Sequence, residues 1–163
     1  MKGSIVRLTS SCDGVSEIFS EIDKLMHSLY PSELNILLSL DEVDQDNSEL
    51  CGIYIEGELA ACGAVIFKQE DNAKYGEFKR IYVKPQFRGL GLSKRILSHL
   101  ISLVTERGLN KIMLETGVKQ YEAIALYRYF GFYERDSYGA YKPDPESMFM
   151  QLYVADKPIL AQT

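Results

Sequence analysis

The chain has 163 residues, of which 46% are hydrophobic and 25% charged, and its formal net charge is −5. This length and apolar content predict one domain, spanning residues 1–163, with a substantial core. The acidic balance argues against nucleic acid as a partner, because binding it requires a basic patch, and is compatible with cationic amines as ligands. No segment approaches the ~20 apolar residues that span a bilayer, and no signal-like apolar run opens the chain. We therefore expect a cytoplasmic protein that does not enter membranes.

Three cysteines, Cys12, Cys51 and Cys62, are present and form no Cys-x-x-Cys pair. Their number is odd, and no histidine lies nearby in sequence. We therefore expect them to be small, buried hydrophobic residues with reduced thiols, in preference to metal ligands or a nucleophile. His27 and His99 fall on expected helices, and we interpret them as surface or packing residues. No metal is predicted.

The N-terminal third predicts a strand followed by two helices. Residues 5–8 form a short apolar run that indicates the strand. Asp13 is expected to cap a helix whose apolar residues recur at helical spacing from 15 to 29. Residues 32–40 predict a second, short helix. Its inward-facing residues are expected to be Leu34, Leu37 and Leu38.

An acidic segment follows, without a basic residue inside it. Its charged residues are Asp41, Glu42, Asp44, Asp46 and Glu49. A solvated loop is the favoured interpretation. If the segment borders a ligand site, its field steers amines inward.

The middle of the chain predicts three strands. Residues 51–55 and 59–67 flank Glu56-Gly57 and indicate a hairpin. Residues 68–74 predict a polar turn, and residues 75–83 the third strand.

The remaining elements alternate between strand and helix. We expect strands over 111–116 and 148–154, a helix over 120–130, and extended chain at 132–133. The segment 136–147 is rich in turn residues and aromatics, as a substrate-facing loop often is. The fold class predicted is therefore α/β, with one mixed central sheet of about six to seven strands and about four helices on its two faces.

A glycine loop joins the strand ending at Val83 to a long helix. Residues 88–93 read Arg-Gly-Leu-Gly-Leu-Ser, and apolar residues then recur at helical spacing as far as Val104. A helix N-terminus presents unpaired N–H groups, and glycines let a ligand approach the backbone, so an anion such as phosphate is predicted here. The spacing matches neither a P-loop nor a dinucleotide fingerprint. An ordinary tight connection is the alternative.

The motif Arg88-x-x-Gly91-x-Ser93 resembles the Arg/Gln-x-x-Gly-x-Gly/Ala signature of the GNAT family of N-acetyltransferases. Ser93 stands where the family usually has glycine or alanine. Residues 114–132 resemble a second family segment, in which an asparagine and an alanine-rich turn precede Leu-Tyr and Gly-Phe. Gln120 replaces that asparagine. The resemblance covers residues 59–154, and features at 115–117 and 141–150 look like a bacterial subgroup.

This resemblance implies the acyl-CoA N-acyltransferase fold and acetyl-CoA as the acyl donor. It places the pantetheine arm along the strand edge at 81–83, where a backbone N–H stabilises the thioester oxygen. The diphosphate lies on the glycine loop. The cofactor-binding residues implied are Ile81, Tyr82, Val83, Arg88, Gly89, Leu90, Gly91, Leu92, Ser93, Lys94 and Gln120.

Three residues are candidates for proton transfer. Tyr127 stands at the family's general-acid position, and its ordinary pKa of ~10 keeps it protonated at neutral pH. Glu77 resembles the catalytic glutamate of the histone-acetylating branch, and Glu115 that of the branch acetylating ribosomal protein N-termini. Either is a candidate base, directly or through a water. The alternatives are a packing tyrosine and strand carboxylates paired with Lys79 or Lys111.

The sequence thus predicts an acetyl-CoA-dependent N-acetyltransferase that acts by direct attack in a ternary complex. The acceptor expected is a primary amine, on a small molecule or a protein. A catalytically silent CoA-binding sensor or interaction module of the same fold is the alternative, and another donor such as succinyl-CoA stays open. The oligomeric state is not indicated.

Overall fold

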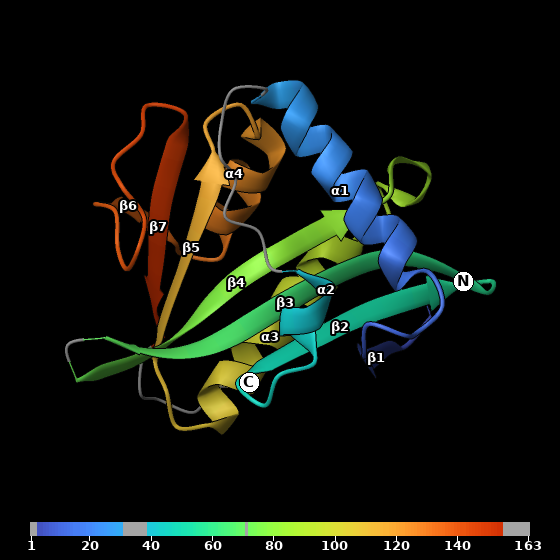
Figure 1. The fold of residues 1–163 in the computed structure, drawn as a ribbon, viewed down its shortest axis with the longest axis horizontal. Helices are drawn as coiled ribbons and strands as arrows, with labels where there is room; N and C mark the ends of the chain where they lie inside the picture. Colours follow the sequence, from blue (N-terminus) through green and yellow to red (C-terminus); the bar gives the residue numbers. More distant parts are fainter. Residues whose placement is uncertain (1–2, 31–38, 71, 155–163) are drawn as a thin grey trace. The chain divides into compact units, whose positions relative to one another are not determined.

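The computed structural model describes residues 3–30, 39–70 and 72–154. Figure 1 traces the elements along the chain. The helices are α1 (Val15–Leu29), α2 (Leu40–Val43), α3 (Leu92–Glu106) and α4 (Tyr121–Tyr129), and a 3₁₀ turn spans Pro85–Phe87. The strands are β1 (Ile5–Leu8), β2 (Ser48–Ile55), β3 (Glu58–Glu70), β4 (Ala73–Val83), β5 (Lys111–Gly117), β6 (Tyr133–Arg135) and β7 (Ser147–Tyr153).

The strands of this described part form a seven-stranded mixed sheet in the order β1-β2-β3-β4-β5-β7-β6. The predicted fold class is confirmed. The chain divides into two compact units. The first unit comprises Met1–Phe67 and Phe78–Leu100, and the second Lys68–Glu77 and Ile101–Thr163. The elements β3, β4 and α3 each contribute residues to both units. The single domain over 1–163 stays a prediction.

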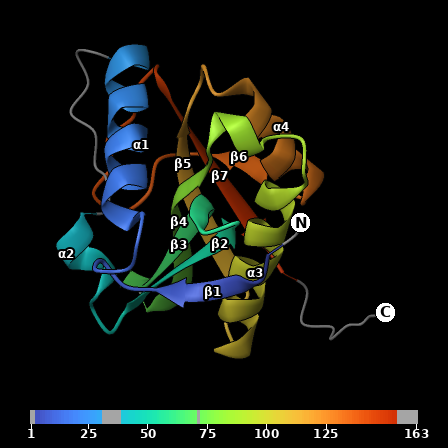
Figure 2. The ribbon, with the colours of Figure 1, turned by 90° about the vertical axis from the view of Figure 1, so that its right-hand side faces the viewer.

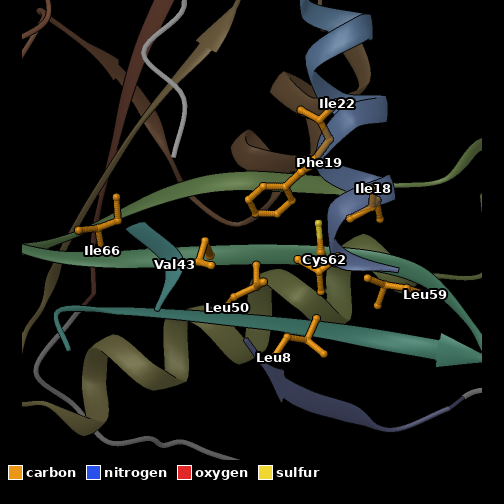
Figure 3. Close-up of a cluster of buried hydrophobic side chains, with 11 residues drawn as sticks. Leu8, Ile18, Phe19, Ile22, Val43, Leu50, Leu59, Cys62 and Ile66 are labelled. Carbon is orange, nitrogen blue, oxygen red and sulfur yellow. The ribbon is translucent and has the colours of Figure 1, made fainter. Parts of the chain in front are cut away.

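The first unit has helices on both faces of its strands. On one face, Ile18, Phe19 and Ile22 of α1 pack on a cluster that includes Leu50 and Cys62 (Figure 3). On the other face, a Cβ added to Gly63 would lie 2.5 Å from Ile96 and 3.1 Å from Leu100 of α3. Neighbouring strand residues point to opposite faces, so α1 and the first part of α3 cover opposite sides (Figure 2).

The β2–β3 hairpin turns at Glu56-Gly57, as predicted. Glu56 has a φ of 50° and Gly57 a φ of 84°, the two left-handed residues that a tight hairpin turn requires. The strands are longer than predicted, because Ser48 pairs with Ile66 and extends the ladder.

The second unit is built on β5, β6 and β7. Antiparallel pairing sets Glu115 opposite Phe149 and Tyr133 opposite Gln151. A small cluster of buried residues then closes over this sheet. Its members are Tyr75, Met113, Tyr138 and Phe149, with Tyr141 packed against them.

Asp13 does not cap α1, contrary to prediction. The N-cap is Gly14, with a φ of 85° and no side-chain hydrogen bond. A left-handed residue at this position moves the helix start one residue onward, which takes the Asp13 carboxylate out of reach of the first N–H groups. The Asp13 carbonyl instead accepts a hydrogen bond of 2.6 Å from the Tyr54 hydroxyl.

The acidic segment is more ordered than the predicted loop. Ser39 and Glu42 form a capping box that starts α2, and Asp44 accepts a hydrogen bond of 2.9 Å from the Ser10 N–H. Oε1 of Glu49 lies 3.8 Å from Nη1 of Arg7, within ion-pair distance. Part of this acidic charge is therefore used in local structure. The predicted helix at 32–40, with Leu34, Leu37 and Leu38, lies outside the described residues except at its end.

The turn predicted at 68–74 is mostly strand. β3 continues to Glu70 and β4 begins at Ala73, so only a tight reversal remains, with Asn72 at a φ of 64°. Gln69, Asn72 and Lys74 beside this reversal are exposed, which suits their polar side chains. No helix in the described part of the chain is long and apolar enough to cross a membrane.

Candidate active site

The glycine loop of the first unit has open space beside its backbone. Gly89 and Gly91 have φ angles of 83° and 76°, a conformation that side chains rarely adopt. A Cβ added to either would meet no atom within 4 Å. The protein's own packing therefore does not require glycine at these positions. A loop of this form, at the start of a 15-residue helix, fits a diphosphate bound by main-chain N–H groups.

The other expected loop residues differ in how their side chains lie. Leu90 is 57% exposed, whereas Leu92 is 3% exposed and faces the core. Ser93 is half-buried and Lys94 exposed. Only the main chain of Leu92 is thus available to a ligand.

Arg88 folds back onto the end of β4. Its Nε donates a hydrogen bond of 3.1 Å to the Val83 carbonyl, and its guanidinium carbon lies 5.8 Å from the centre of the Tyr82 ring. The Tyr82 hydroxyl donates to Glu21 of α1 at 2.7 Å. Burial, and then this hydrogen bond, raise the pKa of Tyr82 to about 12. Ile81 points to the other face, toward α3, where its Cγ1 lies 3.3 Å from a Cβ added to Gly63.

Tyr127 lies in the second unit, on α4, and is 6% exposed. Its ring centre is 5.7 Å from that of Phe132. Burial, and to a lesser degree the charge of Glu115, raise the pKa of Tyr127 above its ordinary value, so the phenol stays protonated at neutral pH. Among residues 3–30, 39–70 and 72–154, none forms a hydrogen bond with the Tyr127 hydroxyl.

Glu115 precedes Tyr127 in the same unit and is partly exposed on β5. Its Oε2 accepts a hydrogen bond of 2.8 Å from the Ser147 hydroxyl. Gln120 sits between β5 and α4, where its side-chain oxygen accepts from the Gly117 N–H at 3.1 Å. This hydrogen bond stabilises the turn between β5 and α4, the helix on which Tyr127 lies.

Glu77 has quite different surroundings. Its side chain is fully buried, and its Oε1 lies 2.6 Å from Nζ of Lys68. Its Oε2 accepts hydrogen bonds from the hydroxyls of Tyr138 and Tyr141, at 2.7 and 2.8 Å. Burial, followed by the charge of Glu77, raises the pKa of both tyrosines. Sequence reasoning named Glu77 but missed Lys68 and both tyrosines, whose only signal was the aromatic, turn-rich composition of residues 136–147.

The expected proton-transfer residues therefore share one unit. Glu77, Glu115 and Tyr127 all belong to the second unit, where burial, and after it the charges of both glutamates, raise the pKa of Tyr141. The loop 88–94 and the strand edge 81–83 belong to the first unit. Within the described ranges, no group of three or more His, Cys, Asp or Glu side chains is arranged to hold a metal.

The Acetyltransferase (GNAT) family model matches residues 15–132, and the chain belongs to this family. It is an acetyltransferase that uses acetyl-CoA as its donor cosubstrate and transfers the acetyl group to an amine, which is the activity of the family. The expectations drawn from the two motifs for family, fold, reaction and donor are confirmed.

Individual relatives agree with this assignment. An IAA acetyltransferase of Azospirillum brasilense is 36% identical over 148 residues, which cover 91% of this chain and 95% of the relative. The uncharacterized N-acetyltransferase YsnE of Bacillus subtilis (strain 168) is 30% identical over 82% of this chain and 90% of its own.

Solved structures share the fold. A Klebsiella pneumoniae protein assigned as an acyl-CoA N-acyltransferase has a TM-score of 0.76 and 28% identity, covering 95% of this chain and 99% of that one. A Thermoplasma acidophilum PaiA N-acetyltransferase, solved in complex with coenzyme A, has a TM-score of 0.69 and 15% identity, covering 94% and 99%. The latter likeness is one of fold alone.

Proposed function

We propose that the chain acetylates a primary amine by direct attack of the amine on the thioester of bound acetyl-CoA. The glycine loop, with Arg88, Ser93 and Lys94, holds the diphosphate, and the β4 edge at 81–83 holds the pantetheine arm. The observation that carries this proposal is the open space beside Gly89 and Gly91, two left-handed residues that the protein's own packing leaves uncovered. Gln120 supports the connection to the helix of Tyr127.

Tyr127 is the proposed general acid. Its raised pKa means that the phenol is protonated at neutral pH and has a proton to give. The Tyr127 hydroxyl forms no hydrogen bond with any described residue, so its proton is not used to hold the fold. A tyrosine serving only to fill the core would not need its hydroxyl, which makes Tyr127→Phe an informative substitution.

Glu115 is the proposed general base, in preference to Glu77. A base must meet the proton of an incoming amine, directly or through one water. Glu115 is partly exposed, whereas Glu77 is fully buried and already binds Lys68, Tyr138 and Tyr141. Those three contacts hold the Glu77 carboxylate inside the second unit, where its full burial keeps it from an incoming amine.

The proposed step balances without a further reactant. The amine nitrogen forms a bond to the acetyl carbon while the carbon–sulfur bond breaks. Glu115 takes the proton that the amine loses, and Tyr127 gives its own proton to the leaving sulfur. The products are an N-acetylated amine and coenzyme A.

The acceptor is proposed only as a class. The formal net charge of −5 favours a cationic amine, on a small molecule or a protein. IAA, the compound in the name of the Azospirillum relative, belongs in the same panel of acceptors. The cytoplasmic location and the single domain expected from the sequence remain proposals.

The test is release of coenzyme A thiol from acetyl-CoA over a panel of alkylamines, polyamines, amino acids, peptides and IAA. We expect saturable, amine-dependent release, with acetyl-CoA binding also seen by calorimetry. Binding without thiol release for every acceptor would instead favour the silent CoA-binding module. A parallel assay with succinyl-CoA tests the choice of donor.

A further inference from the structure

Arg80 has an unusual backbone conformation in the middle of a strand. The non-glycine residues with positive φ in the described part of the chain are Glu56, Asn72 and Arg80. Glu56 and Asn72 lie in tight turns, but Arg80, with a φ of 60°, lies inside β4. A left-handed residue with a long side chain is strained, and it persists only where the surroundings hold it.

The side chain of Arg80 is clamped by α1. Its Nη1 donates hydrogen bonds of 2.8 Å to Asp23 Oδ1 and 3.3 Å to the Phe19 carbonyl. Its guanidinium carbon lies 4.3 Å above the centre of the Phe19 ring. The Arg80 side chain is only 4% exposed, although that of Asp23 is 45% exposed. A planar guanidinium suits this combination of a carboxylate, a carbonyl and an aromatic face.

The backbone of Arg80 is held from β3 as well. The Cys62 thiol donates a hydrogen bond of 3.2 Å to the Arg80 carbonyl. Two residues on, the Tyr82 hydroxyl bonds Glu21, so α1 holds both side chains that this end of β4 directs toward it. The distortion is thus braced from a neighbouring strand and from a helix.

A left-handed residue within a strand bends the chain and re-aims the residues that follow it. Here those residues are 81–83, the strand edge that the proposed function assigns to the pantetheine arm and the thioester. We propose that Arg80 is a positioning residue for acetyl transfer: clamped by Phe19 and Asp23 of α1, it sets the direction of the β4 main chain at Ile81–Val83. This inference rests on the proposed function.

The central variant is Arg80→Gly, because glycine keeps access to the left-handed conformation while removing the clamp. We expect kcat to fall by about 10- to 100-fold, as for misplaced reactants, with a smaller change in KM for acetyl-CoA. In the protein without acetyl-CoA, amide hydrogen exchange of the β4 peptide containing Ile81–Val83 should become faster.

Two further variants remove only part of the contacts that hold the Arg80 side chain. Arg80→Lys keeps the charge but not the planar fork, so it should recover only part of kcat. Asp23→Asn should lower kcat less than Arg80→Gly, because the Phe19 carbonyl and ring still hold the guanidinium. Since Asp23 is half-exposed, this variant is expected to fold even if Arg80→Gly does not. Arg7→Ala, which removes an exposed arginine of the same unit, is the control and should match the wild type.

These experiments distinguish a failure of the Arg80 inference from a failure of the proposed acetyl-CoA site. Unchanged kcat and unchanged β4 exchange in Asp23→Asn and Arg80→Lys, even with a lower melting temperature, would show that the clamp is merely structural. If Gly91→Ala raises KM for acetyl-CoA while the clamp variants keep their kcat, only this inference fails. If Gly91→Ala also leaves KM unchanged, the proposed binding loop is itself wrong.

Discussion

The two units of this acetyltransferase offer different chemistry to a ligand. The first unit presents main chain, at a glycine loop with open space beside it and at the end of β4. The second unit presents side chains whose pKa is raised by burial, among them Tyr127, Tyr138 and Tyr141. Substitutions in the glycine loop of the first unit should therefore change the binding of acetyl-CoA, and those at Tyr127 and Glu115 of the second unit should change the chemical step.

The second unit contains a sharper contrast of its own. Glu77 and Glu115 are both strand carboxylates, yet Glu77 is buried among three donors and Glu115 is partly exposed beside Ser147. A carboxylate that is fully buried, ion-paired and hydrogen-bonded stabilises the fold, and one that remains accessible is available for proton transfer. Residue type alone does not distinguish these two roles.

The largest effect is expected for Tyr127→Phe. Losing a general acid should lower kcat by about 10²–10⁴-fold, with KM for acetyl-CoA unchanged, because phenylalanine keeps the ring. Tyr129→Phe on the same helix, where the tyrosine is 70% exposed, is the matched control. Steady-state kinetics with a saturating amine measure both. Equal activity of the two variants would assign Tyr127 to packing.

Glu115→Gln should be next in size. We expect kcat/KM to fall by about 10²-fold at neutral pH, and the acidic limb of the pH–rate profile to disappear because the titrating base is gone. Melting temperature should change little, since the glutamine can still accept from Ser147. A profile that keeps its acidic limb would place the base elsewhere.

Glu77→Gln should have the opposite effect, lowering stability while leaving kcat largely unchanged. The amide cannot form the ion pair with Lys68, and buried tyrosine hydroxyls lose a charged acceptor, so the free energy of unfolding should fall by about 2 kcal/mol. The loss is moderated by the partial exposure of Lys68, at 39%. Denaturant unfolding and kinetics well below the melting temperature test this together. A large loss of kcat in a folded Glu77→Gln protein would restore Glu77 as the base.

Gly91→Ala compared with Gly57→Ala tests the loop. Both glycines are left-handed, at 76° and 84°, and neither has an atom within 4 Å of an added Cβ. Both variants should therefore lose about 1–2 kcal/mol of stability. Only Gly91→Ala should raise KM for acetyl-CoA, by about tenfold, or about 1.4 kcal/mol of binding. Equal KM values would contradict the proposed diphosphate site.

The last effect is on stability rather than on activity, and it is expected at alkaline pH. The pKa values of Tyr75 and Tyr82 are raised to about 12, chiefly by burial. In the unfolded chain these phenols lose their protons near pH ~10, so their contribution to stability is complete below that pH and is lost as pH rises toward 12. Unfolding free energy should fall by up to about 1.4 kcal/mol per pH unit for each such tyrosine. Denaturant titrations at several alkaline pH values measure the slope, and a flat profile would contradict it.

The sequence by itself determined the elements, the glycine loop and the family. Hydrophobic spacing predicts α1 and α3, and Glu56-Gly57 predicts its hairpin, because these signals depend on neighbours in the chain. The two motifs around Arg88 and Tyr127 are also local, and they were sufficient to indicate acetyl-CoA and an amine acceptor.

Only the tertiary structure decided which polar groups meet. Lys68, Tyr138 and Tyr141 reach Glu77 from other segments, and Phe19 and Asp23 reach Arg80 from α1. Long-range pairing of this kind leaves no periodic trace, since it depends on which strands and loops pack together. For the same reason, the burial that separates Glu77 from Glu115, and the left-handed turn at Arg80, emerge only once the chain has folded.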